Sequence, residues 1–463
     1  MDTNVNIEVR TEKGVITNPT TLNSCLDLFF SIGAMRGRDV TSLYSKAYSE
    51  NPIVATKILF WSRDIRGGAG ERKIFRDILN WLLLNDPQTI KRNVHLITEY
   101  GRWDDVLGLI NTELEKDVFN LIKTALNDGN GLCAKWMPRK GKIANKLRKL
   151  FKLTPKQYRK MVVNLTNVVE TNMCSKEWYK IDYSKIPSMS ASRYQNAFIK
   201  NDSERYLDYK EKLISGETKV NASTLYPYDI IKSLANNGDV VVSEKQWESL
   251  PNYMEDSDER ILPVVDVSGS MTDPVGDNPN LTCMDVSISL GLYISERNSG
   301  DFKDAFITFS ERPTLQYLTG TLSDRYENLR RADWGYSTNI NSVFQLILNQ
   351  AVSHNVPEEK MPTIILILSD MEFDMGVRDY DTDTQTMVET RYKEFGYKVP
   401  KIVYWNLNSR HHQNFPVLSD KKNVALVSGF SPSVVKSILN GNDFSPIGIM
   451  LDTINSERYE LIE

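Results

Sequence analysis

The residues with the clearest chemical potential lie at the ends of two apolar runs that are far apart in the chain. The segment ILPVVDVSGSMTD ends an apolar run at Asp266, and Ser268 and Ser270 follow at every second position. A second run, TIILILSD, ends at Asp370, and Thr338 lies in the loop GYSTNI. Because alternate residues of an extended chain face the same side, the first aspartate and both serines can point at one site.

These side chains form a ligand set made only of oxygen atoms, with coordination positions left for water. Such a set suits Mg²⁺, or Mn²⁺ and Ca²⁺. Zinc prefers nitrogen and sulfur ligands, and the four histidines and four cysteines of the chain show no zinc-like spacing. We therefore predict a site for a hard cation, formed by Asp266, Ser268, Ser270, Thr338 and Asp370.

Catalysis at the same residues is an alternative to simple metal binding. A strand-ending aspartate beside Mg²⁺ acts as a nucleophile in phosphoryl transfer, so a metal-dependent phosphotransferase or nuclease has to be considered. Enzymes of that kind usually carry a second acid two residues later, where this chain has Ser268. The chain also has no G-x-S-x-G elbow and no histidine near these residues for a hydrolase triad. We expect a protein that is not an enzyme.

The pattern of apolar residues in the elements that position this site changes near residue 258. From about 20 to 130, apolar residues recur every three or four positions, and Asp, Asn, Pro or Gly interrupts the pattern at most junctions, which predicts a stack of short helices. After 258, short runs rich in β-branched residues alternate with helical patterns, which predicts a parallel sheet covered on both faces. Aspartates at the ends of neighbouring parallel strands would then meet at one edge of the sheet.

The predicted fold is therefore α followed by α/β: a helical-repeat domain, HEAT-like and capable of forming a ring, and then a doubly wound parallel sheet. The predicted divisions are an N-terminal arm (1–18), the helical domain (19–236) with a basic insert (131–200), a polar linker (237–258) and the sheet domain with the metal site (259–463).

The net charge of −4 conceals a strong asymmetry between the two halves. Residues 1–250 hold 38 Lys and Arg against 29 Asp and Glu, whereas residues 251–463 hold 18 against 31. The excess concentrates at 131–200, where 16 basic residues face 3 acidic ones, and 133–161 has no acid at all. Opposite signs in two halves favour two domains with different partners.

The acid-free segment has the composition of an RNA-binding surface. Its cations can neutralise phosphates, and the interleaved Trp136, Phe151 and Tyr158 can stack on unpaired bases. The alternative is a solvated helix face in a module that binds only proteins. Two arginines of the glycine-rich stretch RDIRGGAGER are added as RNA contacts, although a tight helix–helix turn also explains its glycines. The predicted RNA-binding residues are Lys135, Arg139, Lys140, Lys142, Lys146, Arg148, Lys149, Arg159, Lys160, Arg63 and Arg66.

The C-terminal motif resembles the metal-ion-dependent adhesion site (MIDAS) of von Willebrand factor A domains. The resemblance rests on Asp266-x-Ser268-x-Ser270, then Thr338, then Asp370. It implies that these five residues contact the metal directly or through water, and that an acidic group of a protein partner fills an open position. That family usually has Asp-Gly at the last position, where this chain has Asp370-Met371.

The N-terminal half is similar to the Ro autoantigen family, whose TROVE module of helical repeats is joined to a von Willebrand A-like domain. It is more similar still to a related uncharacterised family of plants, fungi and large DNA viruses. The similarity rests on RDIRGGAGER, EYGRWDDVL, KWMPR, SKEWYKIDYSKIPS and KVNASTLYPYDI. It implies a ribonucleoprotein scaffold that holds structured non-coding RNA or its single-stranded ends.

Two further features bear on location. No run of about 18 apolar residues is present, so no membrane span or membrane partner is expected. The cysteines are scattered without a disulfide pattern, which is typical of a reducing compartment. We expect a cytoplasmic protein.

Overall fold

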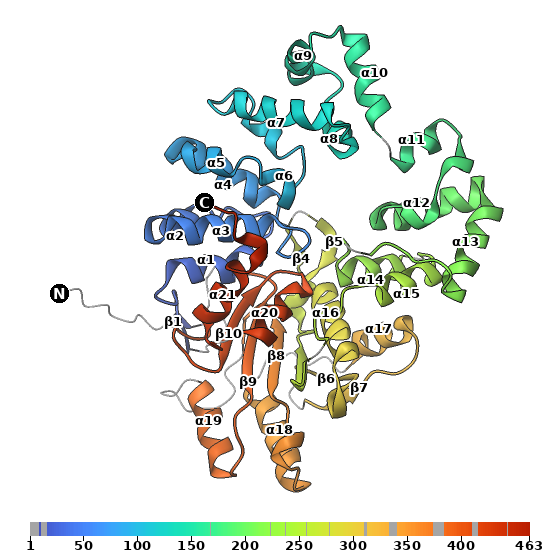
Figure 1. Cartoon of the computed structure of the whole chain (residues 1–463). Coiled ribbons are helices and arrows are strands. Elements are labelled where there is room, and N and C mark those ends of the chain that lie inside the picture. Colours follow the sequence, from blue (N-terminus) through green and yellow to red (C-terminus); the bar gives the residue numbers. More distant parts are fainter. Residues whose placement is uncertain are drawn as a thin grey trace.

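A computed structural model describes residues 9–10, 16–166, 168–222, 224–236, 238–255, 257–276, 278–309, 313–332, 340–373, 384–409, 415–441 and 443–463. Figure 1 shows helices in the first half of the chain and a sheet covered by helices in the second. The expected order, α followed by α/β, is confirmed.

The central sheet has the strand order β10-β9-β8-β3-β6-β7. Its strands are β3 (Ile261–Val265), β6 (Ala305–Thr308), β7 (Leu315–Tyr317), β8 (Ile364–Ser369), β9 (Lys401–Asn406) and β10 (Val424–Ser428). Five strands are parallel, and the edge strand β7 pairs antiparallel with β6. The five predicted strands form the parallel part of the sheet, and the antiparallel edge strand β7 was not predicted. Every residue of β3 and β8 is buried, as expected for central strands.

Alternate residues of the strands enter two hydrophobic cores, one on each face of the sheet. On β8, Ile364 and Leu366 join the core of one face, while Ile365 and Ile367 join the other. The helices of the first face are α16 (Cys283–Arg297), α17 (Leu322–Arg330), α20 (Val435–Asn440) and α21 (Pro446–Ile454), and those of the second are α18 (Ile340–Ser353) and α19 (Thr384–Glu394). Burial on both faces explains why these strands read as continuous apolar runs.

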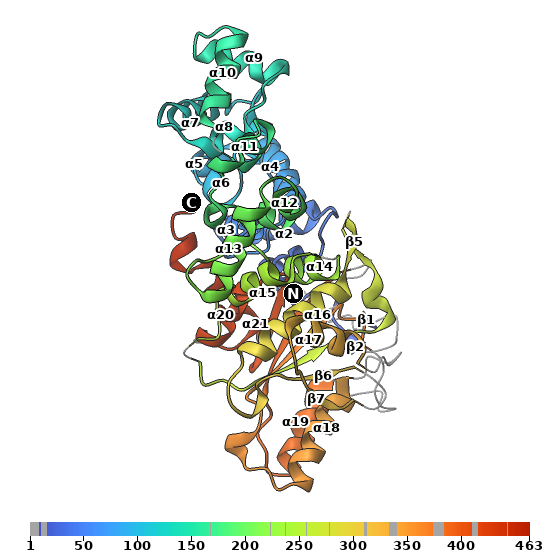
Figure 2. The same cartoon turned by 90° about the vertical axis from the view of Figure 1, so that its right-hand side faces the viewer.

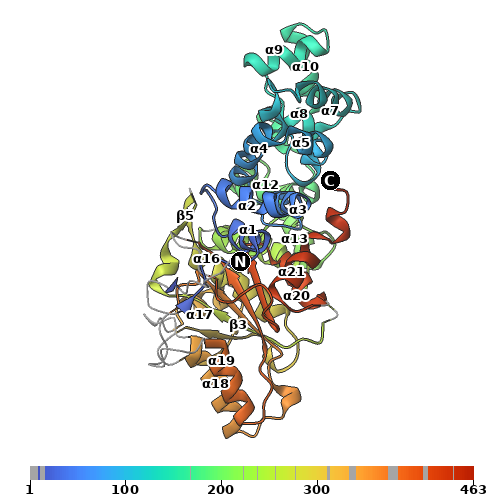
Figure 3. The ribbon, with the colours of Figure 1, turned by 90° about the vertical axis from the view of Figure 1, so that its left-hand side faces the viewer.

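The helical region leads away from the sheet and then returns to it. Its helices are α1 (Ser24–Ile32), α2 (Thr41–Glu50), α3 (Pro52–Arg63), α4 (Lys73–Asn85), α5 (Pro87–Asn93), α6 (Ile97–Tyr100), α7 (Glu115–Asn127), α8 (Gly131–Trp136), α9 (Gly141–Leu150), α10 (Pro155–Leu165), α11 (Val169–Cys174), α12 (Ser188–Asn201), α13 (Ser203–Ser215), α14 (Pro227–Ala235) and α15 (Val240–Glu248). Helices α9 and α10 lie farthest from the sheet in all three views (Figures 1, 2 and 3). The return path ends where α14 packs against α16. Among the described helices, none is both long and apolar enough to cross a bilayer.

Two predicted boundaries differ from the structure. The predicted linker 237–258 contains α15, which packs against α13 and α14 because Val242 and Trp247 are buried. Helix α1, assigned to the helical domain, lies along the edge strand β10. The Ser428 hydroxyl donates to the Phe29 carbonyl oxygen at 2.9 Å, and the Gly33 amide donates to the same hydroxyl oxygen at 3.2 Å. Helix α1 thereby covers one open edge of the sheet.

Buried ion pairs tie together the segments that carry the N-terminal sequence similarity. Arg63 Nη2 lies 2.7 Å from Asp105 Oδ2, and both side chains are almost fully buried. Arg76 pairs with Asp104 and Asp105 across the same junction. The motifs RDIRGGAGER and EYGRWDDVL are thus neighbours in space, and their charges serve the packing of α3, α4 and the turn after α6.

The C-terminal segment is also held by the helical region. The Asp64 carboxylate is fully buried and accepts hydrogen bonds from Arg458 Nη2 at 2.7 Å and from the Tyr459 hydroxyl at 2.9 Å. Asn93 exchanges hydrogen bonds with the backbone of Glu463. The end of the chain therefore packs on the helices near its beginning.

Candidate functional site

The predicted metal ligands Asp266 and Asp370 follow two adjacent central strands, β3 and β8. In the parallel register Val265 lies opposite Leu368, so both strands end at the same edge of the sheet. The Asp266 amide donates to the Leu368 carbonyl oxygen at 3.0 Å, and the Ser369 hydroxyl donates to Asp266 Oδ2 at 2.6 Å. The structure thus brings together residues that are 104 positions apart in the sequence.

The loop after β3 folds around the Asp266 carboxylate. The Ser268 amide donates to Asp266 Oδ1 at 2.9 Å, and the Ser268 and Ser270 hydroxyls are 3.1 Å apart. A short 3₁₀ turn over Gly269–Thr272 continues the loop. Asp266 is fully buried and Ser268 nearly so, so the protein holds this carboxylate in a defined orientation.

The loop after β8 adopts a backbone conformation that usually requires glycine. Met371 has φ +66°, in the left-handed region, while its side chain is buried in the core of the second face. A side chain in this region costs of order 1 kcal/mol or more. Methionine therefore takes the backbone conformation that favours glycine, and its packing offsets the cost. Asp370 and Glu372 on either side are both buried.

The electrostatics of this edge favour a bound cation. Burial, and to a smaller extent the charge of the neighbouring Asp370 carboxylate, raises the pKa of Asp266 to about 6. Two buried carboxylates lose hydration when they ionise, and their negative charges repel each other. A divalent ion bound between them would offset both the desolvation cost and the repulsion. No group of three or more His, Cys, Asp or Glu suited to a metal occurs in the described residues, so an ion held here would need hydroxyl oxygens as further ligands. Of the predicted ligands, Thr338 lies outside the described residues.

Further polar residues at this edge were missed by the sequence analysis. Asn406 is the last residue of β9, the next strand, and Asn408 lies two residues later, the same alternate spacing as the serines after β3; both are buried. The Asn408 amide donates to Asn406 Oδ1 at 3.1 Å, and Asn408 Oδ1 accepts from Arg38 Nη2 at 3.1 Å. Within the described residues, the Asn408 side-chain nitrogen has no hydrogen-bond partner. The segment NLN at the end of an apolar run was the signal that could have revealed them.

The residues between α1 and α2 lie over this edge. The Ser409 amide donates to the Ala34 carbonyl oxygen at 3.1 Å, and a Cβ added at Gly276 would lie 2.9 Å from the backbone oxygen of Arg36. The candidate metal site is consequently next to the junction between the helical region and the sheet.

The ionisation of Asp266 predicts a pH dependence of stability in the absence of metal. Because its pKa is higher in the folded than in the unfolded protein, the stability due to its protonated form is complete below about pH 4 and is lost as pH rises to about 6. Unfolding with a chelator present should show Asp266→Asn gaining roughly 1–3 kcal/mol over the parent between pH 4 and pH 7. A pH-independent difference would contradict the raised pKa.

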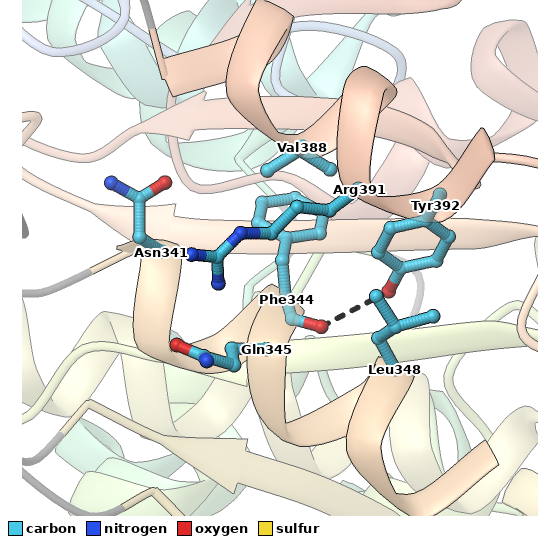
Figure 4. A pocket seen from close by; sticks show the side chains of 7 residues that line it. All are labelled: Asn341, Phe344, Gln345, Leu348, Val388, Arg391 and Tyr392. Atoms are coloured by element: carbon cyan, nitrogen blue, oxygen red, sulfur yellow. Dashed lines mark hydrogen bonds between the residues drawn. The ribbon is translucent and has the colours of Figure 1, made fainter. Parts of the chain in front are cut away.

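A small pocket between α18 and α19 lies on the second face of the sheet (Figure 4). Phe344, Val388 and Tyr392 line it, and the Tyr392 hydroxyl donates to the Phe344 carbonyl oxygen at 3.2 Å. Its volume of ≈ 20 Å³ has room for about one water molecule. This pocket is therefore too small for a ligand.

The predicted RNA-binding residues separate into two groups. Most of them lie on or beside α9 and α10, and we call the positively charged surface at 139–160 the basic tip. Of the predicted residues, Arg139, Lys140, Lys142, Lys149, Arg159 and Lys160 are exposed there, while Lys146, Arg148 and the adjacent Lys135 are half-buried. Lys152 and Lys156 are also exposed on the basic tip. Lys146 pairs with Glu115 at 2.6 Å. Arg66 is exposed on a distant turn.

Two expectations about this surface need correction. Arg63 is 3% exposed and its charge is matched by Asp105, so it is not accessible to RNA. The aromatic residues of the basic segment serve packing: Tyr158 is 1% exposed, Trp136 lies under the Arg102 guanidinium at 3.9 Å, and Phe151 packs on the core. The basic tip therefore offers positive charge with little aromatic surface for stacking.

Comparison with known proteins identifies similarity over nearly the whole chain. A family model described as "Domain of unknown function (DUF2828)" matches residues 11–135 and 137–259, and a second, "Domain of unknown function (DUF7788)", matches 260–457. The "Uncharacterized protein L728" of Acanthamoeba polyphaga mimivirus is 31% identical over 506 residues, covering 96% of this chain and 86% of the relative. The border between the two family models falls one residue before β3.

Proposed function

The chain belongs to the DUF2828 family, and from this premise and the geometry above we propose that it is a Ro-like RNA-binding scaffold with a von Willebrand A-like metal domain. In this proposal the basic tip binds RNA phosphates. Asp266, Ser268, Ser270, Thr338 and Asp370 hold Mg²⁺, at which a protein partner with an acidic group docks. The protein has no catalytic role.

The observation that carries the RNA part is the segregation of positive charge at the far end of the helical region. The eight exposed cations of the basic tip belong to a segment without any acidic residue, in a protein of net charge −4. A compact cluster of this kind gains affinity for nucleic acid by releasing counterions from phosphates. The metal part is supported by the paired buried carboxylates at the ends of β3 and β8.

The salt dependence of RNA affinity tests the RNA part. We expect replacement of Lys140, Lys142, Lys149 and Arg159 by Gln to flatten the plot of log affinity against log salt by about 3, since each phosphate contact contributes a slope of roughly 0.7–0.9. The measurement is fluorescence anisotropy with a structured RNA that carries a single-stranded 3′ tail, at several KCl concentrations.

The matched control removes four exposed lysines from the sheet region, Lys303, Lys393, Lys398 and Lys436. This variant changes net charge by the same amount and should retain the parental slope. Equal slopes for all three proteins would refute RNA binding at the basic tip. If nuclease treatment of a lysate left every partner bound and no RNA copurified, the chain would be a protein-interaction module instead.

A further inference from the structure

A polar pocket lies where the helical region meets the hairpin formed by β4 (Pro274–Val275) and β5 (Asn278–Thr282). Side chains of α12, α14 and β5 line it, and these three elements adjoin in Figures 1 and 2. Its volume is ≈ 350 Å³, at the lower end of the range of small-molecule sites in proteins, about 300–1,000 Å³. The space suits one small heterocyclic molecule.

One wall of the pocket is an aromatic ring held in place from several sides. The Tyr228 ring stacks on Tyr226, with centroids 5.5 Å apart and planes 23° apart, and meets the Phe430 ring edge-on at 6.0 Å. The Arg36 guanidinium interacts with the Tyr228 hydroxyl. Because the half-buried ring is already immobilised, a planar ligand can stack on it with little loss of side-chain entropy.

The charges around the pocket select against an anion. Lys232 pairs with Asp285 at 3.1 Å, so its positive charge is already matched. The Arg36 guanidinium acts on Asp229 electrostatically but forms its ion pair with Glu71 at 2.7 Å, and Asp229 is in no ion pair among the described residues. Its Oδ2 accepts the Tyr226 amide at 2.9 Å. Burial raises the pKa of Asp229 to about 6, which leaves it ionised at neutral pH. A carboxylate can accept more than one hydrogen bond, so Asp229 can accept further hydrogen bonds from N–H groups of a ligand.

Amide side chains supply the remaining polar contacts. Gln195, Asn236 and Asn280 all line the pocket. Gln195 Oε1 accepts the Asp239 amide at 2.6 Å, which orients its nitrogen as a donor. Amide groups match the alternating donors and acceptors on the edges of nucleobases.

We propose that this pocket binds a single unstacked guanine base, stacked on Tyr228 with its donor edge toward Asp229. Guanine presents two adjacent donors, N1–H and the N2 amino group, whereas adenine and cytosine present one amino group and uracil one N–H. The base comes from a free nucleoside or from a nucleotide of bound RNA. Only the second source rests on the function proposed above.

The pocket would also provide a contact to a base, which the basic tip lacks. The aromatic residues of the basic tip are used in packing, so that surface contacts phosphates without reading bases. A guanine pocket elsewhere on the helical region would add sequence preference to electrostatic binding.

Binding of the four free nucleosides to the full-length protein tests the pocket directly. Calorimetry should give guanosine the highest affinity by roughly tenfold or more over adenosine, cytidine and uridine. Asn236→Trp, which fills the pocket from an exposed position, should abolish guanosine binding. Asn349→Trp, the same change on the exposed side of α18, should leave it unchanged.

A second experiment uses RNA and tests the guanine pocket independently of RNA binding at the basic tip. Structured RNA with a guanine in its tail should bind more tightly than the same RNA with adenine there, and Asn236→Trp should remove only that preference. The basic-tip variant should weaken both RNAs equally. Guanosine binding without RNA binding would support the pocket and refute the RNA proposal. The inference would be overturned if all four nucleosides bound with equal affinity and Asn236→Trp did not change that affinity. The RNA with a guanine tail would then also bind no more tightly than the RNA with adenine.

Discussion

Asp105→Ala is expected to lower the free energy of unfolding by about 3–5 kcal/mol. The substitution leaves the Arg63 guanidinium buried without its partner, and Arg63 is 3% exposed. It also removes the oxygen that accepts the Arg102 amide at 2.9 Å and the oxygen that pairs with Arg76 at 2.6 Å. Chemical denaturation followed by tryptophan fluorescence measures the loss.

Two further variants show whether burial of charge is the cause. Asp77 forms an exposed pair with Lys73 at 2.7 Å, so Asp77→Ala should cost less than about 1 kcal/mol. The double replacement Arg63→Met with Asp105→Leu removes both charges and should recover much of the stability lost in Asp105→Ala. If Asp105→Ala and Asp77→Ala were equally mild, the ion pair would not be a main support of the helical region.

Mg²⁺ is expected to raise the free energy of unfolding by about 2.7 kcal/mol at 100 times its dissociation constant, and Asp370→Ala should remove this gain. The ion would lie between the Asp266 and Asp370 carboxylates, which are both buried and close enough that the Asp370 charge raises the pKa of Asp266. Because only ionised carboxylates bind the ion, the gain should grow as pH rises from 5 to 7. Thermal unfolding with Mg²⁺, Mn²⁺ or Ca²⁺ against a chelator measures it.

The control is Asp301→Ala, which removes an exposed carboxylate on the sheet region. This variant should keep the full response to metal. Identical melting curves of the parent protein with chelator and with each of the three ions would contradict the metal site. A response that persisted in Asp370→Ala would place the ion elsewhere on the protein.

The metal prediction and the RNA prediction depended on different kinds of information. Asp266, Ser268 and Asp370 end strands that are apolar throughout, and parallel topology brings the ends of such strands to one edge. Asn406 and Asn408 lie at the same edge but escaped notice, because a single pair of amides after a strand resembles an ordinary loop. In the basic segment, charge could be counted from the sequence, whereas the burial of Tyr158 could not.

What the sequence determined by itself was local. The three- and four-residue spacing of apolar positions determined the helices, the continuous apolar runs determined the central strands, and the charge count located the basic segment. The tertiary structure decided which segments meet: Arg63 with Asp105, α1 with the edge of β10, and α12 and α14 with β5 around the polar pocket. The physical reason is that periodicity shows which side of an element is buried, while its partner depends on packing between segments that can be hundreds of residues apart.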